Sequence, residues 1–240
     1  MKFITVKTRP ILPPKDNFYE ILNASLPKLK ESDVLLITSK VLAIHQGRCI
    51  KMGHEINKDK IIIQEAERYI PRSQSPGGWI LTIKEHTLIP AAGIDESNGN
   101  GYYILWPKNS TNLAKRICIY LKEKFRLENL AVIITDSHTT PLRFGVTGIS
   151  IGFYGLEPAY DYRGKKDVFG RKLKFTKTNI VDAISAMGVL LMGEGKECTP
   201  MVILRDANFI KFTNRTTYKK LVIDPEKDIY SPLYKTFKKK

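Results

Sequence analysis

Apolar and polar residues along the chain follow two different periods, which predicts a mixture of helices and strands. Helical spacing of apolar residues is found in residues 16–29, 58–69, 110–124 and 179–192. Short apolar runs typical of buried strands occupy residues 1–6, 33–40, 79–83, 102–106, 130–135, 145–155 and 201–204. Turn-rich or charged loops are expected at 71–78, 89–101 and 160–171. This order of elements predicts an α+β (mixed α/β) fold and leaves the order of the strands open.

The helix predicted for residues 179–192 has a signal at each end. Asn179 is a good N-cap residue, and Asp182 follows three positions later in the first turn. Gly193 is a typical C-terminal stop. No internal repeat and no linker rich in Pro, Gly or Ser divides the chain.

Composition predicts a protein with a buried core and no membrane span. Of the 240 residues 42% are hydrophobic, and no apolar run approaches the ~18 residues that a spanning helix needs. The N-terminus lacks the apolar stretch of a signal peptide. Cys49, Cys118 and Cys198 are far apart and form no C-x-x-C pair, which argues against a zinc ribbon or a disulfide framework. We therefore expect a cytoplasmic protein.

The formal net charge of +15 favours a polyanionic partner, such as nucleic acid, anionic lipid or a phosphorylated small molecule. A generally lysine-rich proteome would produce the same excess. No RNA-binding or helix-turn-helix signature accompanies the charge. The chain also lacks the G-x-x-x-x-G-K-[ST] loop of P-loop enzymes and the G-x-G-x-x-G dinucleotide fingerprint, and no redox cofactor is expected.

Three acidic residues stand where a divalent cation could bind. Asp95 lies in a glycine-flanked turn, and Asp136 closes the apolar run at 130–135. Glu194 stands between two glycines just beyond a helix end, where the helix dipole disfavours a negative charge and a bound cation would remove the conflict. Mg²⁺ typically takes one or two carboxylates together with nucleotide phosphates. Asp95 could equally cap its own turn, and Glu194 could belong to a solvated acidic loop.

Basic residues near predicted loops and strand ends are candidates for binding phosphate or carboxylate groups. Ser39 and Lys40 end the run at 33–40, and Arg48 follows shortly afterwards. A further group surrounds the central loops: Arg143, Arg163, Lys165, Lys166, Arg171 and Lys172. An arginine can bind a carboxylate or phosphate through two parallel N–H bonds. Arg163 could instead pair with Asp161 and only shape its loop.

Five motifs, in order along nearly the whole chain, resemble those of the γ-glutamyl ligases that act on coenzyme F(420)-0. Residues 161–173, D-Y-R-G-K-K-D-V-F-G-R-K-L, match the family's D-Y-R-G-x-x-D-x-x-G-R-x-L. Residues 92–98, A-G-I-D-E-S-N, resemble its A-G-I-D-x-S-N turn. Residues 135–137, T-D-S, and 192–194, M-G-E, resemble its T-D-[ST] and M-G-[QE] segments. Ser39-Lys40 and Gly47-Arg48 match a further segment.

This resemblance implies a fold of two intimately packed subdomains in an intertwined homodimer, with nucleotide near the interface. The chain would be a single family unit over residues 1–240, with 1–88 plus 200–240 and 89–199 as candidate subdomains. The implied activity joins L-glutamate to the acceptor through a γ-glutamyl amide bond, using GTP or ATP and two Mg²⁺ or Mn²⁺ ions. Phosphorylation of the acceptor carboxylate would give an acyl phosphate, which the glutamate amine would attack. No membrane or nucleic-acid partner is expected.

The resemblance also implies roles for individual residues. Asp95 and Asp136 would bind the first metal ion, and Ser137 and Glu194 the second. Asp136 would also take part in catalysis, together with Arg143 and Arg163. The remaining positions would contact nucleotide: Pro10, Ile11, Ser39, Lys40, Arg48, Asn98, Gly193, Gly195 and Lys196.

Two departures from the family pattern bear on the acceptor. Where the family often has S-K-x-x-S-K, this chain has S-K-V-L-A-I, so Ile44 replaces a lysine that would meet phosphate and Arg48 or another base must compensate. Residues 136–143, D-S-H-T-T-P-L-R, differ from the commoner D-T-x-G-R-P-x-R. The chain resembles most a branch thought to serve folate metabolism, so folate and F(420)-0 are both candidate acceptors.

Two other classes of function stay open at this point. A non-catalytic nucleic-acid-binding module driven by the charge would show basic residues with interleaved aromatics and steeply salt-dependent binding. It would give no reason for the three acidic positions. A binding protein that kept the fold and lost ligation is a further alternative, against which the intact Asp95 and Asp136 speak.

Overall fold

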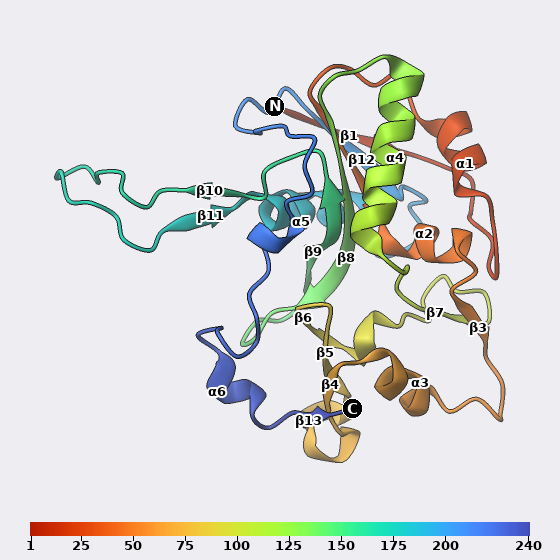
Figure 1. Ribbon diagram of the computed structural model, residues 1–240. Helices are drawn as coiled ribbons and strands as arrows, with labels where there is room; N and C mark the ends of the chain where they lie inside the picture. The colour runs from red at the N-terminus through yellow and green to blue at the C-terminus, as the bar shows by residue number, and fades with distance from the viewer.

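A five-stranded sheet organises the computed structural model, which describes residues 1–240 (Figure 1). Its strands, in spatial order, are β1 (Lys2–Val6), β12 (Met201–Arg205), β2 (Asp33–Thr38), β8 (Leu130–Thr139) and β9 (Val146–Tyr154). Only β2 and β8 run parallel, and the other neighbours are antiparallel. The carboxyl ends of β2 and β8 therefore meet at the same edge, which is where open α/β sheets bind their ligands.

Helices cover both faces of this sheet, which explains why its central strands are apolar on both sides. Helices α1 (Phe18–Ser25), α2 (Ser39–His45) and α4 (Ser110–Phe125) lie on one face, and α5 (Ile180–Met192) lies on the other (Figure 1). The alternation along β2 supplies both cores, since Leu35 points to the first and Leu36 to the second. The predicted signals of α5 are confirmed: the Asn179 side chain accepts from the N–H of Asp182, and Gly193 ends the helix.

A smaller antiparallel sheet forms the lower part of the molecule as drawn in Figure 1. Its strands, in spatial order, are β13 (Lys238–Lys239), β4 (Arg68–Ile70), β5 (Leu81–Lys84) and β6 (Thr87–Pro90). A separate apolar cluster joins helix α3 (Lys58–Glu65) to this region through Ile62, Ile80 and Leu105. Strands β3 (Cys49–Lys51) and β7 (Tyr102–Ile104) pair beside it. The five-stranded sheet draws strands from both candidate subdomains, so it marks no boundary between them.

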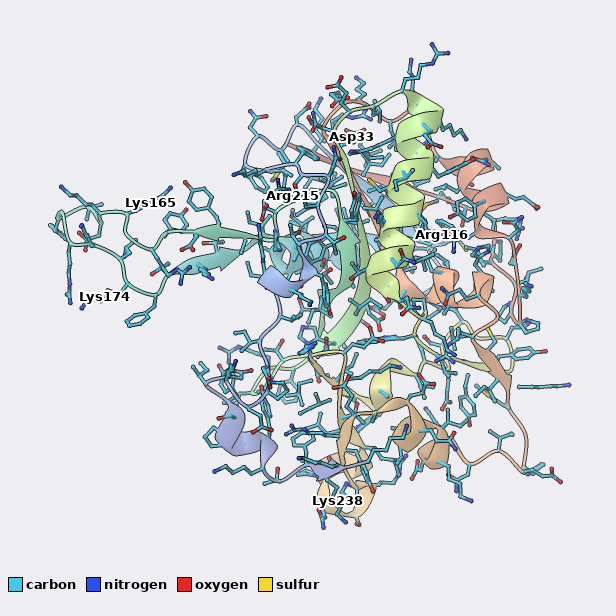
Figure 2. All side chains as sticks on the ribbon, in the orientation of Figure 1. Asp33, Arg116, Lys165, Lys174, Arg215 and Lys238 are labelled. Carbon is cyan, nitrogen blue, oxygen red and sulfur yellow. The ribbon has the colours of Figure 1, made fainter.

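A hairpin arm projects from the body of the protein (Figure 1). Its base is the antiparallel pair β10 (Ala159–Asp161) and β11 (Lys177–Asn179). Lys165 and Lys174 lie on its outer part (Figure 2). The last helix, α6 (Ser231–Tyr234), is short and lies near the C-terminus. None of the helices is both long and apolar enough to cross a membrane.

Several predicted element boundaries are wrong; the helix expected over 16–29, for example, spans only Phe18–Ser25. The apolar run at 33–40 changes from strand to helix at Ser39, where α2 begins, and α2 is as largely buried as β2. The helix expected over 58–69 stops at Glu65, and Arg68–Ile70 pairs with β5 instead. Strand β8 does not close at residue 135 but runs on to Thr139, after a register shift against β9 between Ile134 and Thr135.

Candidate active site

A cleft of about 610 Å³ lies at the edge where β2 and β8 end. Five segments that are distant in the sequence form its walls: the N-terminal stretch 8–13, the start of α2, the turn at 95–100, the extension of β8 and the loop 193–200 after α5. Backbone hydrogen bonds join the loop 193–200 to the N-terminal stretch and to the end of β2. The N–H of Thr8 donates to the carbonyl of Cys198 at 2.8 Å, and the N–H of Thr38 donates to that of Pro200 at 3.0 Å.

Asp136 enters the cleft from the extension of β8 and is only partly exposed. Its Oδ2 accepts a hydrogen bond from the indole N–H of Trp106. Burial raises the pKa of the Asp136 carboxyl to about 6; the Trp106 bond opposes this rise, and the neighbouring charge of Asp95 adds to it. Desolvation of the charged form is the cause of such a rise.

Asp95 is both a turn-capping residue and a cleft residue. Its Oδ1 accepts from the backbone N–H of Ser97 at 2.7 Å, and its Oδ2 accepts from the Ser97 hydroxyl at 3.0 Å. The Lys40 ammonium lies 2.5 Å from Oδ2. Burial works against the charge of Asp95, but Lys40 and the Ser97 hydrogen bonds outweigh it and leave the pKa below its ordinary value.

Glu194 faces the same cleft from the loop after α5. Burial raises the pKa of the Glu194 carboxyl above its ordinary value, and the charge of Asp95 raises it further. The charge of Lys40 and a hydrogen bond from Ser137 lower this pKa, but they do not outweigh burial. The preceding Gly193 has a φ of +77°, and a Cβ there would stand 2.4 Å from the Glu197 carboxyl carbon. The Glu197 side chain could move aside, but the backbone conformation of Gly193, with φ of +77° and ψ of 169°, favours glycine.

Three carboxylates from separate segments thus share one cleft, and the charge of Asp95 raises the pKa of the other two. Lys40 lowers the pKa of each of them, which places its ammonium among them. The oxygen-only set of Asp95, Asp136, Ser137 and Glu194 is of the type that hard divalent cations prefer. No three His, Cys, Asp or Glu side chains lie close enough to form a ready-made metal site. The Lys40 ammonium donates to the carbonyl and the hydroxyl of Ser97, so a positively charged side chain already lies beside the Asp95–Ser97 turn.

Most residues predicted to contact nucleotide line this cleft. These are Pro10, Ile11, Lys40, Asn98, Gly193, Gly195 and Lys196. The Asn98 amide donates to the carbonyl of Gly195 at 3.0 Å and so connects two walls of the cleft. Ser39 lies beside Lys40 at the start of α2 but is buried. Ile44, which replaces the family's lysine, is buried and contributes an apolar part of the wall.

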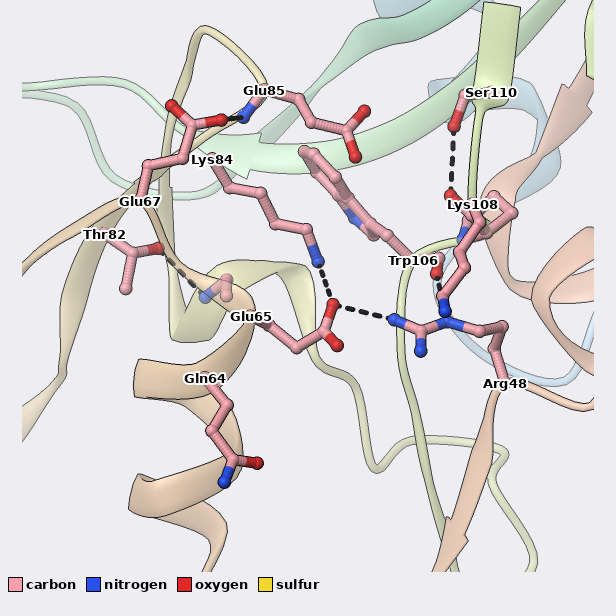
Figure 3. A network of polar contacts seen from close by, with 12 residues as sticks. Arg48, Gln64, Glu65, Glu67, Thr82, Lys84, Glu85, Trp106, Lys108 and Ser110 are labelled. Atoms are coloured by element: carbon pink, nitrogen blue, oxygen red, sulfur yellow. Dashed lines mark hydrogen bonds and ion pairs between the residues drawn. The ribbon is translucent and has the colours of Figure 1, made fainter. Parts of the chain in front are cut away.

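The structure places three predicted arginines away from the cleft. Arg48 was expected to meet phosphate, but its guanidinium pairs with Glu65 at 2.7 Å and donates to the carbonyl of Trp106 (Figure 3). Arg143 is exposed between β8 and β9, where its guanidinium donates only to the carbonyl of Leu142. Arg163 pairs with Asp161 at 2.6 Å at the base of the arm. The alternative of an internal Asp161–Arg163 pair is therefore what the isolated chain adopts.

Sequence reasoning missed one polar residue that contacts the site directly, Trp106. The strand prediction for 102–106 treated it as a core residue, and it is indeed buried. A buried indole N–H nevertheless needs an acceptor, and the chain has only two tryptophans. The need for an acceptor was the one feature of the sequence that could have pointed to Trp106. It does not identify Asp136 as the acceptor, because the two residues are 30 positions apart.

Comparison with known proteins identifies a family. The family model described as F420-0:Gamma-glutamyl ligase matches residues 6–206. Proteins named coenzyme F420:L-glutamate ligase are similar over most of their length. The one from Methanosarcina barkeri is 30% identical over 94% of this chain and 93% of its own, and that from Methanosarcina mazei is 32% identical over 87% and 88%. One from Methanococcus maripaludis is 35% identical over 75% and 71%.

These matches confirm the resemblance inferred from the motifs and the expectation of an enzyme of the γ-glutamyl ligase type. The matched region contains every segment that forms the cleft. The chain belongs to the F420-0:γ-glutamyl ligase family.

Proposed function

We propose that this protein adds L-glutamate through a γ-glutamyl amide bond to an acceptor of the F(420)-0 or folate type, using GTP and divalent metal ions. The observation that carries the proposal is the convergence of Asp95, Asp136 and Glu194 on one cleft with Lys40 among them. A merely structural acidic cluster would have no reason to face a cavity, since buried like charges are costly without a partner. Bound divalent cations would supply that partner.

The metal ions would be held by Asp95, Asp136, Ser137 and Glu194. When bound, they would neutralise phosphate charge and favour phosphoryl transfer to a carboxylate. Lys40 would then exchange its contact with Asp95 for one with phosphate, since the long side chain can turn within the same cleft. The nucleotide would lie along the loop 193–196 and the N-terminal stretch at Pro10 and Ile11, where backbone groups and Lys196 face the cavity.

The reaction would proceed in two balanced steps. An oxygen of the acceptor carboxylate attacks the γ-phosphorus, the bond from that phosphorus to the β–γ bridging oxygen breaks, and GDP leaves. The glutamate amine then attacks the acyl carbon, and the carbon–oxygen bond to phosphate breaks. Inorganic phosphate leaves, and the amine proton passes to a base. His138, two residues beyond Asp136, does not line the cleft.

We propose a homodimer in which the arm contacts the second copy. The outer part of the arm exposes Val168, Phe169 and Phe175, with exposed fractions of 92%, 94% and 87%. Such apolar side chains on a projecting hairpin call for a covering surface. The turn between β8 and β9 exposes Leu142 and Phe144 in the same way. In a dimer of this kind Arg143 and Arg163, which lie outside their own cleft, could approach the partner's cleft.

The arm also carries the interleaved basic and aromatic residues that the nucleic-acid alternative requires, including Tyr160, Lys165 and Phe169. We favour ligation because family membership and the acidic cleft support it together. Binding to an RNA or DNA duplex that weakens steeply with salt, with no nucleotide turnover, would support the alternative instead.

An isotope-transfer experiment tests the proposed reaction. The acceptor, F(420)-0 or folate, carries ¹⁸O in the carboxyl group that receives glutamate, and the protein is incubated with GTP, Mg²⁺ or Mn²⁺, and glutamate. The acyl phosphate route predicts one ¹⁸O atom in the released inorganic phosphate. Product formation with unlabelled phosphate would contradict that route, and the acceptor that reacts identifies the substrate class.

A further inference from the structure

We propose that Trp106 is a positioning residue for Asp136 and that an ion network behind it fixes its indole. This inference rests on the proposed function, in which Asp136 binds a divalent cation. Trp106 is 1% exposed and does not line the cleft, so it acts on the site only through Asp136. Its N–H donates to Oδ2 of Asp136. An indole offers a single donor in the plane of a rigid ring, so the direction of this bond is set by where the ring is held.

The ring of Trp106 is confined on more than one side. Gly93 packs against the indole so closely that a Cβ at that position would stand 2.1 Å from the indole nitrogen. The ammonium of Lys84 lies over the ring, 5.3 Å from its centre. A cation over an indole face is attracted by the ring's negative face, most strongly where water is excluded. Lys84 is only 5% exposed, so this contact is desolvated.

One carboxylate ties the network together behind the ring (Figure 3). The Oε2 of Glu65 lies 2.7 Å from the Lys84 ammonium and 2.7 Å from the Arg48 guanidinium. Arg48 also donates through Nε to the carbonyl of Trp106 at 3.1 Å. The ring and the backbone of Trp106 are thus both connected to Glu65. A buried ammonium without such a pair would be strongly destabilising, so the network is tightly interdependent.

The consequence is a connection between the two sheets that ends at a predicted metal ligand. Lys84 ends β5 of the smaller sheet and Glu65 ends α3, whereas Asp136 belongs to β8 of the main sheet. Holding Oδ2 of Asp136 against Trp106 orients the other oxygen for a cation. Site geometry held by rigid, buried supporting groups is more precise than geometry left to the ligand residue alone. This assigns Arg48, which does not face the cleft, a role in supporting Trp106.

The test compares Trp106→Phe with Trp79→Phe, the same substitution at the only other tryptophan, which is 60% exposed. Phenylalanine keeps an apolar ring and removes the N–H. Mn²⁺ affinity is measured on each protein, with and without GTP, from the electron paramagnetic resonance signal of free Mn²⁺, together with the thermal unfolding midpoint. Positioning predicts a loss of Mn²⁺ affinity on the order of 10–100-fold for Trp106→Phe, with kcat reduced and the acceptor KM within about twofold. Trp79→Phe should match the wild type.

A second variant keeps the proposal testable if Trp106→Phe fails to fold. Lys84→Met removes the cation over the ring while keeping the length of the side chain, and it should weaken Mn²⁺ binding by a smaller factor than Trp106→Phe. Wild-type Mn²⁺ affinity in Trp106→Phe, or in Lys84→Met if Trp106→Phe does not fold, would overturn the positioning role and leave the proposed function intact. A wild-type protein that binds no Mn²⁺ even with GTP would overturn both.

Discussion

Removing the charge of Asp136 should stabilise the protein while abolishing its activity. The carboxyl has an ordinary pKa of 3.8 and a pKa of about 6 in the fold. The difference is about 2 units, and at ~1.4 kcal/mol per unit the ionised form costs about 3 kcal/mol above pH 6. Because the folded-state pKa is the higher one, stability is lost as pH rises from about 4 to about 6 and stays lost above that range. Asp136→Asn avoids this cost and can still accept from Trp106.

The assay is thermal unfolding of the wild type and Asp136→Asn, without divalent cations, at about pH 8 and about pH 4. For a chain of this size ~1 kcal/mol moves the unfolding midpoint by ~2–4 °C, so the variant should unfold up to about 6–12 °C higher at pH 8. The two midpoints should converge near pH 4, where the wild-type carboxyl is protonated. A variant that is no more stable at pH 8, or equally more stable at both pH values, would refute the reasoning. Ligation by the variant within about twofold of the wild type would refute the role of Asp136.

Three further substitutions test other parts of the account. Lys40→Met should reduce kcat by ~100-fold or more, because it removes the positive charge proposed to contact phosphate; an unchanged kcat would argue against that contact. The same change should raise the pKa of Asp95, which NMR titration of that carboxyl measures. Gly193→Ala should destabilise the fold by ~1–3 kcal/mol in chemical denaturation because its φ is +77°, whereas Gly53→Ala, in open space, should have little effect. Phe169→Ser should shift a homodimer toward monomer in sedimentation velocity, with Ile229→Ser as the exposed control; a wild type that is monomeric at micromolar concentration would contradict the dimer.

Long, strongly periodic elements could be predicted from the sequence because their signals are local. Helix α5 has its N-cap at Asn179 and its stop at Gly193, and both lie within the element or next to it. The strands of the smaller sheet have only two to four residues, which is short for a period to be recognised, and only β5 overlaps a predicted run, at 79–83. The change from β2 to α2 at Ser39 lies inside one continuous apolar run, where composition does not separate a buried strand from a buried helix.

For the candidate site, the cleft positions of the three carboxylates could be predicted from the sequence, and the ion-pair partner of Arg48 could not. Asp95, Asp136 and Glu194 stand next to turns, strand ends and glycines, which are features of the local sequence. Arg48 pairs with Glu65 and supports Trp106, partners 17 and 58 positions away, and no local pattern predicts such an ion pair. The extension of β8, which carries Asp136 into the cleft, depends on its pairing with β9 and its register shift.

Glutamate transfer by the purified protein tests the central claim most directly. The protein is incubated with isotopically labelled L-glutamate, GTP, and Mg²⁺ or Mn²⁺, separately with F(420)-0 and with folate, and products are identified by mass spectrometry with fragmentation. Asp136→Asn serves as the folded inactive control. The account predicts a product heavier by one labelled glutamyl residue, attached through the acceptor's carboxylate, that requires nucleotide and metal and is absent with the variant. No adduct with either acceptor, or one that forms equally with Asp136→Asn, would contradict it.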